Sequence, residues 1–227
     1  MRKVVVFVEG QAEQIFVREL LLKYYEYNAA EVGIICYKLI SETLEKAEYD
    51  LGNTKANNFF QIINAGGDNK VLSAMTKRSQ RMFDAGYNVI IGLRDMYSKA
   101  YREISPAIVS EEINKRNIES ARDYIKSVLG DSNVRIHYAI MEVETWMLAL
   151  IDCWKGNMTD EEIAKILPPD SNIELIYHPA EVVKAITSTN GVPYDKHSSQ
   201  VNSIISKITK GDYLALFDSN KCPSYNE

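Results

Sequence analysis

The first distinctive feature of the sequence is the run Lys3-Val4-Val5-Val6-Phe7-Val8, which is followed directly by Glu9-Gly10. This continuous β-branched and aromatic run is typical of a strand that is buried on both faces, as in a parallel sheet. Gly10 ends the run, and from residue 11 to about residue 26 apolar residues recur at helical spacing. The chain is therefore predicted to open with a strand, a tight turn and a helix.

The same alternation continues through the first two-thirds of the chain. Strands are predicted over 33–40, 59–64, 88–93 and 134–141, and helices over 70–85, 106–129 and 144–151. Strands that alternate with helices predict an α/β domain with a mainly parallel sheet. Beyond about residue 156 short helical patterns are punctuated by Pro and Gly. We therefore expect an α/β domain over 1–155 and a helical extension over 156–227, packed on the same domain.

The composition is that of an ordinary globular protein, with 46% hydrophobic and 25% charged residues. The formal net charge of −5 does not by itself indicate a polyanionic partner, although a local basic patch can be hidden in the total. The three cysteines lie far apart without CxxC spacing, which favours free thiols in a reducing compartment. No targeting segment is visible and no apolar run is long enough to span a membrane. A cytoplasmic protein without membrane contact is expected.

Acidic residues follow three of the predicted strands. Glu9 comes directly after the first strand, Asp95 stands at the end of the strand over 88–93, and Glu142 and Glu144 follow the strand over 134–141. The carboxyl ends of parallel strands meet at one edge of a sheet, where α/β proteins place their ligands. Glu13 lies on the first turn of the following helix, four residues from Glu9. Clustered carboxylates need a cation, and oxygen ligands favour Mg²⁺ or Mn²⁺.

A structural interpretation of the same acids stays open. Acidic residues at helix N-termini complement the helix dipole, which alone accounts for Glu13 and Glu144. Agreement among three strand ends favours a functional site. Arg94, beside Asp95, is a candidate for phosphate contacts, although basic residues in loops are usually just solvated.

The segment Val8-Glu9-Gly10-Gln11-Ala12-Glu13-Gln14-Ile15-Phe16 resembles the opening motif of TOPRIM domains, which occur in OLD-family nucleases, topoisomerases and primases. More narrowly, the chain resembles a bacterial TOPRIM-like family of unknown function. Three further segments carry this resemblance: Glu142-Val143-Glu144-Thr145-Trp146, Tyr194-Asp195-Lys196-His197 and Cys222-Pro223-Ser224-Tyr225. It implies a TOPRIM-like, Rossmann-like sheet flanked by helices.

The resemblance also implies roles for individual residues. Glu9 would be a metal ligand or acid/base residue with Glu13 as its support, and Asp95 matches the first acid of the Asp-x-Asp that holds Mg²⁺ in TOPRIM domains. Tyr97 stands where that motif has its second acid, so a two-metal site needs Glu142 or Glu144 as a substitute. Lys196 would be the phosphate-facing lysine of OLD-type nucleases.

Together these observations predict a Mg²⁺- or Mn²⁺-dependent enzyme that cleaves or processes a nucleic-acid phosphodiester, in DNA or RNA. The resemblance further suggests defence against phage, beside an ATPase partner. The predicted roles are metal ligation by Glu9, Asp95 and Glu142, water orientation by Glu13 and Glu144, and phosphate binding by Arg94 and Lys196. Two alternatives remain. Tyr97 favours a non-catalytic TOPRIM scaffold that senses or binds a partner such as an ATPase, and the negative net charge favours a hydrolase of small nucleotides or phosphoesters.

Overall fold

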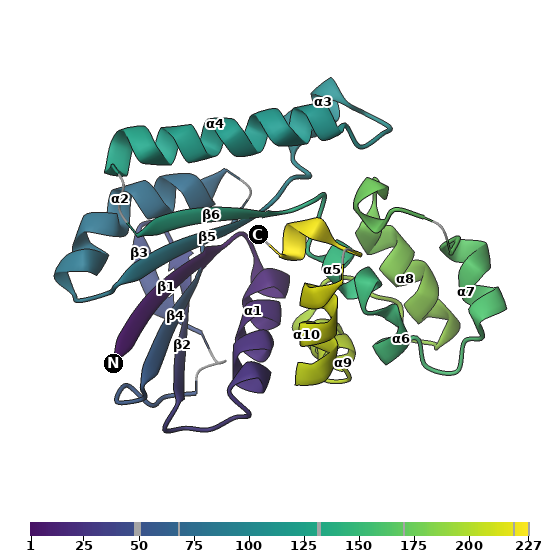
Figure 1. Ribbon diagram of the computed structural model, residues 1–227, viewed down its shortest axis with the longest axis horizontal. Coiled ribbons are helices and arrows are strands. Elements are labelled where there is room, and N and C mark those ends of the chain that lie inside the picture. Colours follow the sequence, from purple (N-terminus) through teal and green to yellow (C-terminus); the bar gives the residue numbers. More distant parts are fainter. Residues whose placement is uncertain (48–50, 68, 131–132, 170, 220, 227) are drawn as a thin grey trace. The chain divides into compact units, whose positions relative to one another are not determined.

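The computed structural model describes residues 1–47, 51–67, 69–130, 133–169, 171–219 and 221–226. It confirms an α/β fold with a six-stranded, mostly parallel sheet flanked by helices (Figure 1). The strand order is β3-β2-β4-β1-β5-β6; in the register that the structure describes, β1 pairs in parallel with β4 and β5, β2 pairs in parallel with β4, and β2 pairs antiparallel with β3. The strands are β1 (Arg2–Val8), β2 (Val32–Ile40), β3 (Thr43–Lys46), β4 (Asn58–Asn64), β5 (Val89–Asp95) and β6 (Val134–Ala139).

The helices of the first two-thirds alternate with these strands, and the C-terminal third is helical, both as predicted from the residue pattern. The helices of the first two-thirds are α1 (Gln11–Tyr24), α2 (Lys70–Asp84), α3 (Lys99–Ile104), α4 (Glu111–Leu129) and α5 (Glu144–Ala149). The helices of the C-terminal third are α6 (Ile151–Trp154), α7 (Asp160–Ile166), α8 (Pro179–Thr189), α9 (Ser198–Ile205) and α10 (Lys210–Asp218). Short 3-10 turns lie at Ile173–Leu175 and Pro223–Tyr225.

Strand β1 lies at the centre of the sheet, paired in parallel with β4 on one side and β5 on the other. Its residues from Val4 to Val8 are all buried. Because both faces of the strand are covered, the run is apolar throughout and does not alternate with polar residues. Gly92 of β5 is the strand partner of Phe7. A Cβ added at Gly92 would lie 2.3 Å from the sulfur of Met75, so α2 packs closely on that face of the sheet. Helix α1 packs against the opposite face, on β4 and β2.

Two elements differ from the expected pattern. Strand β3 was not predicted, because its sequence Thr-Leu-Glu-Lys has no apolar run and its residues are largely exposed at the sheet edge. The helix expected over 106–129 begins only at Glu111, as α4, and a short helix that was not expected, α3 at Lys99–Ile104, lies before it, separated from α4 by the segment 105–110. The residue before a proline disfavours the helical conformation, and Ser105, before Pro106, has φ −134° and ψ 87°.

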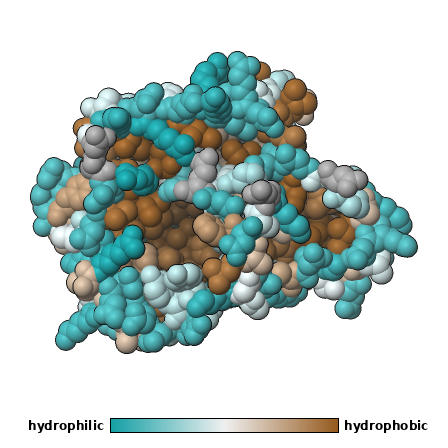
Figure 2. All heavy atoms as spheres, viewed as in Figure 1, coloured by the Kyte–Doolittle hydropathy of each residue, from teal (hydrophilic) through white to brown (hydrophobic). Residues whose placement is uncertain are grey.

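The chain divides into two compact units, each with its own core. The first comprises Met1–Arg94 and Glu112–Tyr138, and the second comprises Asp95–Glu111 and Ala139–Glu227. The boundary predicted near residue 155 falls inside the second unit. In the space-filling view, apolar side chains are visible over the strands of the first unit and over α8 of the second, among hydrophilic ones (Figure 2). Within the described residues, no helix is long and apolar enough to cross a membrane.

Candidate acidic site

The turn between β1 and α1 holds two buried carboxylates of the first unit. Glu9 is 7% exposed and Glu13 is 4% exposed. Glu13 folds back over Gly10, because a Cβ added at Gly10 would lie 2.9 Å from a Glu13 carboxylate oxygen. The Glu9 carbonyl accepts hydrogen bonds of 3.0 Å from the backbone N–H groups of Gly66 and Gly67. A residue without a side chain at position 10 therefore lets the two acids share one tight turn.

Arg94 supplies positive charge to this turn. Its Nε lies 3.6 Å from Glu9 Oε1, and its Nη1 donates a 3.2 Å hydrogen bond to the hydroxyl of Tyr138. The guanidinium also lies over the Tyr138 ring, 5.5 Å from the ring centroid. Burial raises the pKa of Tyr138 above its ordinary value despite the opposing charge of Arg94, so the hydroxyl stays protonated. Arg94, predicted to bind phosphate, is thus an ion-pair partner of Glu9 in this structure, and its phosphate role remains a prediction.

The second unit contains three further acids from the sequence prediction. Asp95 ends β5, and its Oδ1 accepts a 3.1 Å hydrogen bond from the backbone N–H of Val143. Glu142 lies in the turn after β6, and Glu144 opens α5 with a side chain that is fully buried. Met141, directly before Glu142, has φ +66°, a conformation that non-glycine residues rarely adopt. The Asp95 hydrogen bond therefore ties the end of β5 to the acidic turn.

Lys196 lies between two of these acids. Its ammonium is 2.7 Å from Glu142 Oε1 and 3.4 Å from Glu144 Oε2, and its side chain is 40% exposed. Burial alone would lower the pKa of Lys196, but the charges of Glu144, Glu142 and Asp95 outweigh it and hold that pKa above its usual value. Lys196 also has φ +66°. Strained backbone of this kind is found preferentially at functional sites, although it also occurs elsewhere in this chain.

Tyr194 is a member of this cluster that was not predicted as a site residue. Its buried hydroxyl donates a 2.7 Å hydrogen bond to Glu144 Oε1, so the Glu144 carboxylate is held by a phenol on one oxygen and faces an ammonium on the other. Tyr194 stands two residues before Lys196 in one of the segments that carry the family resemblance. That motif was the signal in the sequence, but only the structure shows which acid the phenol contacts.

We expect Tyr194→Phe to lower the free energy of unfolding by about 1.5–3 kcal/mol, because it removes a buried hydrogen bond to a charged group. Tyr27→Phe is the matched control, since the exposed Tyr27 hydroxyl donates a 3.0 Å hydrogen bond to Glu19. That control should lower stability by less than about 0.5 kcal/mol. Urea unfolding of both variants measures the difference, and equal losses would contradict a special role for the Tyr194–Glu144 bond.

Tyr97, at the position of the second TOPRIM acid, belongs to an aromatic cluster. Its ring meets the rings of Tyr177 and His178 edge to face, with centroid distances of 5.5 Å and 5.2 Å. Its backbone N–H donates a 2.8 Å hydrogen bond to the carbonyl of Met141. The tyrosine therefore extends an aromatic contact from the acidic turn to the segment before α8.

The acids of the sequence prediction are divided between the units. Glu9 and Glu13 belong to the first unit, whereas Asp95, Glu142 and Glu144 belong to the second. Within the parts of the chain that the structure describes, no three His, Cys, Asp or Glu side chains form a group that could hold a metal ion. The donors are nevertheless carboxylate oxygens, the chemistry that a hard divalent cation prefers. Magnesium or manganese ligation by Glu9, Asp95 and Glu142 remains a prediction.

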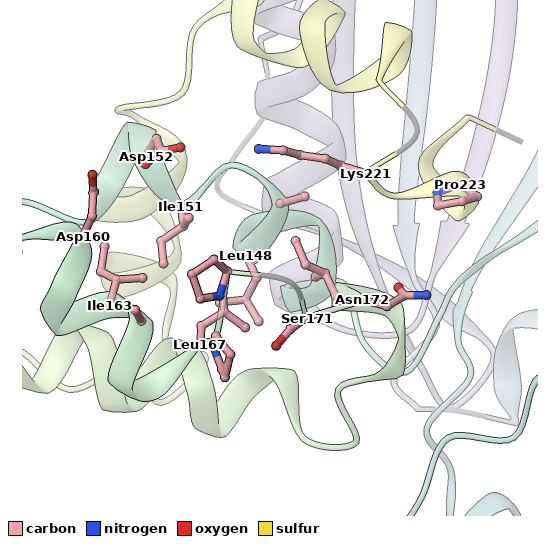
Figure 3. A pocket seen from close by; sticks show the side chains of 15 residues that line it. Leu148, Ile151, Asp152, Asp160, Ile163, Leu167, Ser171, Asn172, Lys221 and Pro223 are labelled. Atoms are coloured by element: carbon pink, nitrogen blue, oxygen red, sulfur yellow. The ribbon is translucent and has the colours of Figure 1, made fainter.

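The second unit also contains a cavity, and it is lined by residues other than these acids. Its volume is about 530 Å³, and its lining includes the apolar residues Leu148, Ile163, Leu167 and Pro223 together with the charged residues Asp152 and Lys221 (Figure 3). None of the predicted site residues lines it. Asp152 already pairs with Lys155 at 2.9 Å. The cavity therefore adds no group to the acidic site.

Comparisons with known proteins do not assign the chain to a family. No known family model matches it, and no curated protein matches it. One crystal structure is similar, that of a protein from Lactobacillus plantarum WCFS1 described provisionally as a cell surface hydrolase, with 13% sequence identity and a TM-score of 0.31. The similarity covers 73% of this chain and 62% of that one. It carries no argument about this chain's function.

Proposed function

We propose that this protein is a Mg²⁺- or Mn²⁺-dependent, TOPRIM-like enzyme that processes nucleic-acid phosphodiesters. The observation that carries the proposal is the cluster in which Lys196 contacts Glu142 and Glu144. The negative charge of Asp95 also helps to raise the pKa of Lys196. Buried carboxylates around one partly exposed ammonium are costly to maintain for stability alone, and such groups concentrate at functional sites. The resemblance of the segment 8–16 to the TOPRIM opening motif names the class of chemistry.

In this proposal Asp95 and Glu142 hold the cation in the second unit, and Glu9 keeps the ligand role that the resemblance to TOPRIM domains implies. When bound, such a cation stabilises negative charge on a phosphate and makes a water ligand more acidic. Glu144 and Glu13 position the carboxylates and water, and Tyr194 fixes the rotamer of Glu144 through its hydrogen bond. The half-exposed ammonium of Lys196 is suited to donate hydrogen bonds to a phosphate oxygen, and Arg94 is the second candidate for that role. A role in phage defence beside an ATPase is part of the same proposal.

Titration calorimetry with Mn²⁺ and Mg²⁺ tests the proposal directly. Wild-type protein should bind one of these ions, and Glu9→Gln should weaken the affinity by at least about tenfold because it removes a charged ligand. Asp160→Asn, an exposed acid that contacts Lys155, is the matched control and should bind like wild type. Absence of measurable binding to either ion by the wild type would contradict the proposal. Hydrolysis of free nucleotides without cleavage of plasmid or RNA would favour a small-phosphoester hydrolase instead.

A second candidate is a non-catalytic TOPRIM scaffold that binds a partner such as an ATPase. The observation that favours it is that Glu142 and Glu144, the two acids that could replace the missing second acid, already share the ammonium of Lys196. Tyr97 contributes a ring to an aromatic cluster instead of a carboxylate. On this hypothesis the wild type binds neither ion and cleaves neither DNA nor RNA, so the same titration distinguishes the two.

A further inference from the structure

An aromatic and cationic surface lies beside the acidic turn of the second unit. Three rings, those of Tyr97, Tyr177 and His178, contact one another edge to face, and the Tyr177–His178 centroids are 4.7 Å apart. The guanidinium of Arg102 lies over the Tyr97 ring, 5.3 Å from its centroid. Two segments that are far apart in the sequence, 97–102 and 177–178, therefore build one surface, which we call the ring cluster.

The ring cluster combines exposed groups with a fixed base. His178 and Arg102 are exposed, whereas Tyr97 and Tyr177 are partly buried. The Tyr177 hydroxyl donates a hydrogen bond of 2.5 Å to the Ser105 carbonyl, which holds that ring in place. The His178 imidazole contacts the rings of Tyr97 and Tyr177, and the Arg102 guanidinium lies over the Tyr97 ring, so both exposed planar groups rest against tyrosine rings. Such surfaces are suited to stack on a planar aromatic ligand.

Backbone hydrogen bonds attach both halves of the ring cluster to the acidic turn. Tyr97 N–H donates to the carbonyl of Met141, which directly precedes Glu142. On the other side, the backbone N–H of Ala180, two residues after His178, donates a 3.3 Å hydrogen bond to Glu142 Oε2. A planar group stacked on the cluster would therefore be held next to Glu142 and its partner Lys196.

We propose that the ring cluster binds an unpaired nucleobase, so that the substrate of the acidic site is a single-stranded nucleic acid or an unpaired end. This inference rests on the proposed function and names its substrate class. A base within a duplex has both faces covered by its neighbours, whereas an unpaired base can stack on His178 or Arg102. Arg102 in the ring cluster and Lys196 beside Glu142 are cationic side chains of the kind that contact the phosphates of such a strand.

The test measures binding without cleavage, by fluorescence anisotropy in EDTA with a short single strand that carries a fluorescent adenine analogue. The probes are single-stranded DNA, single-stranded RNA, the corresponding duplexes and free adenosine monophosphate as competitor. Wild type should bind a single strand about tenfold more tightly than its duplex and quench the analogue by stacking. His178→Ala and Arg102→Ala should each weaken single-strand binding about fivefold to tenfold and abolish the quenching, with duplex binding unchanged.

Two controls exclude general effects of charge and of exposed rings. Arg116→Ala removes an exposed arginine from α4, and Phe217→Ala removes an exposed ring from α10. Both should bind single strands within about twofold of wild type, because neither residue belongs to the ring cluster. Because His178 and Arg102 are exposed, their variants are expected to remain folded, which circular dichroism verifies.

The outcomes separate this inference from the proposed function. Equal affinity for single strand and duplex, or quenching that persists in both cluster variants, overturns the inference. Competition by free adenosine monophosphate at the affinity of the strand also overturns it, in favour of a mononucleotide ligand. A protein that binds single strands through the ring cluster but shows no Mg²⁺- or Mn²⁺-dependent cleavage leaves the inference standing and refutes the proposed enzyme. Mg²⁺- or Mn²⁺-dependent cleavage by a wild type that does not quench the adenine analogue supports the proposed enzyme and overturns the inference about the ring cluster.

Discussion

Lys196→Met is expected to lower the free energy of unfolding by about 2–3 kcal/mol at pH 7. Removing one partner of a fully buried ion pair typically costs about 3–5 kcal/mol, because the other charge stays buried without compensation. The loss here should be smaller, since the Lys196 side chain is 40% exposed and water can screen it. Glu144 bears most of the effect because its side chain is fully buried. Urea unfolding, monitored by tryptophan fluorescence, measures the change.

The pH dependence of this variant has a defined sign. In the wild type the pKa of Lys196 is raised on folding, so its stabilising contribution is complete below the unfolded-state value of 10.5 and is lost only as pH rises through the folded-state value. Wild-type stability between pH 5 and 7 is therefore independent of Lys196 titration. In the variant, the fully buried Glu144 carboxylate lacks its cationic partner, so its ionised form destabilises the folded state and the destabilisation grows as pH rises and the carboxylate ionises. The deficit should thus be larger at pH 7 than at pH 5.

Two further variants distinguish this ion pair from other effects of the substitution. Lys196→Met combined with Glu144→Gln should recover about half of the lost stability or more, because the buried negative charge is removed together with its partner. Lys184→Met removes a surface ion pair with Glu181, at 3.8 Å, and should cost less than about 1 kcal/mol. If the double variant is no more stable than the single one, charge compensation is not the reason for the loss.

The sheet could be predicted because its strands carry a strong local signal. The run from Val4 to Val8 is apolar without interruption, since it is covered on both faces, and the same holds for Ile62 and Ile63 in β4. Strand β3 has no such signal, because Leu44 is its only apolar residue and its position is set by pairing with β2. Edge pairing depends on partners elsewhere in the chain, which a residue pattern does not record.

The candidate site was predictable in its acids and not in its partners. The sequence identified Glu9, Asp95 and Glu142 because each lies at or directly after the end of a predicted strand, which the neighbouring residues show. The contacts of Lys196 with Glu142 and Glu144 span more than fifty residues and depend on how the C-terminal helices pack. The hydrogen bond from Tyr194 to Glu144 has the same origin. Long-range pairing of this kind is set by tertiary structure, so the sequence indicated Lys196 only through the resemblance to OLD-type nucleases and left its acidic partners unidentified.

Asp95→Asn is expected to reduce Mg²⁺-dependent cleavage by about 10²–10³-fold, the loss usual when one charge-stabilising group is removed from an active site. The stability should change by less than about 1 kcal/mol. Asp95 is 7% exposed, and its Oδ1 accepts the Val143 N–H at 3.1 Å, a hydrogen bond that an asparagine oxygen can also accept. The substitution therefore removes the negative charge while the local structure is kept.

The comparison with Glu142→Gln makes this prediction specific. Glu142 accepts the 2.7 Å hydrogen bond of Lys196, so its amide variant should lose both activity and stability, whereas Asp95→Asn should lose activity alone. Asp152→Asn is the control, because Asp152 is an exposed acid of the same unit that pairs with Lys155. It should cleave at the wild-type rate.

The measurement is the initial rate of cleavage of a single-stranded substrate over a range of Mg²⁺ concentrations, beside urea unfolding of each variant. A metal ligand at Asp95 requires that the Mg²⁺ concentration for half-maximal rate rises in Asp95→Asn and stays unchanged in Asp152→Asn. Should Asp95→Asn cleave at the wild-type rate with an unchanged Mg²⁺ midpoint, Asp95 is a structural acid whose role ends at the hydrogen bond to Val143. Its place at the end of β5 would then serve to fix the acidic turn and not to bind a cation.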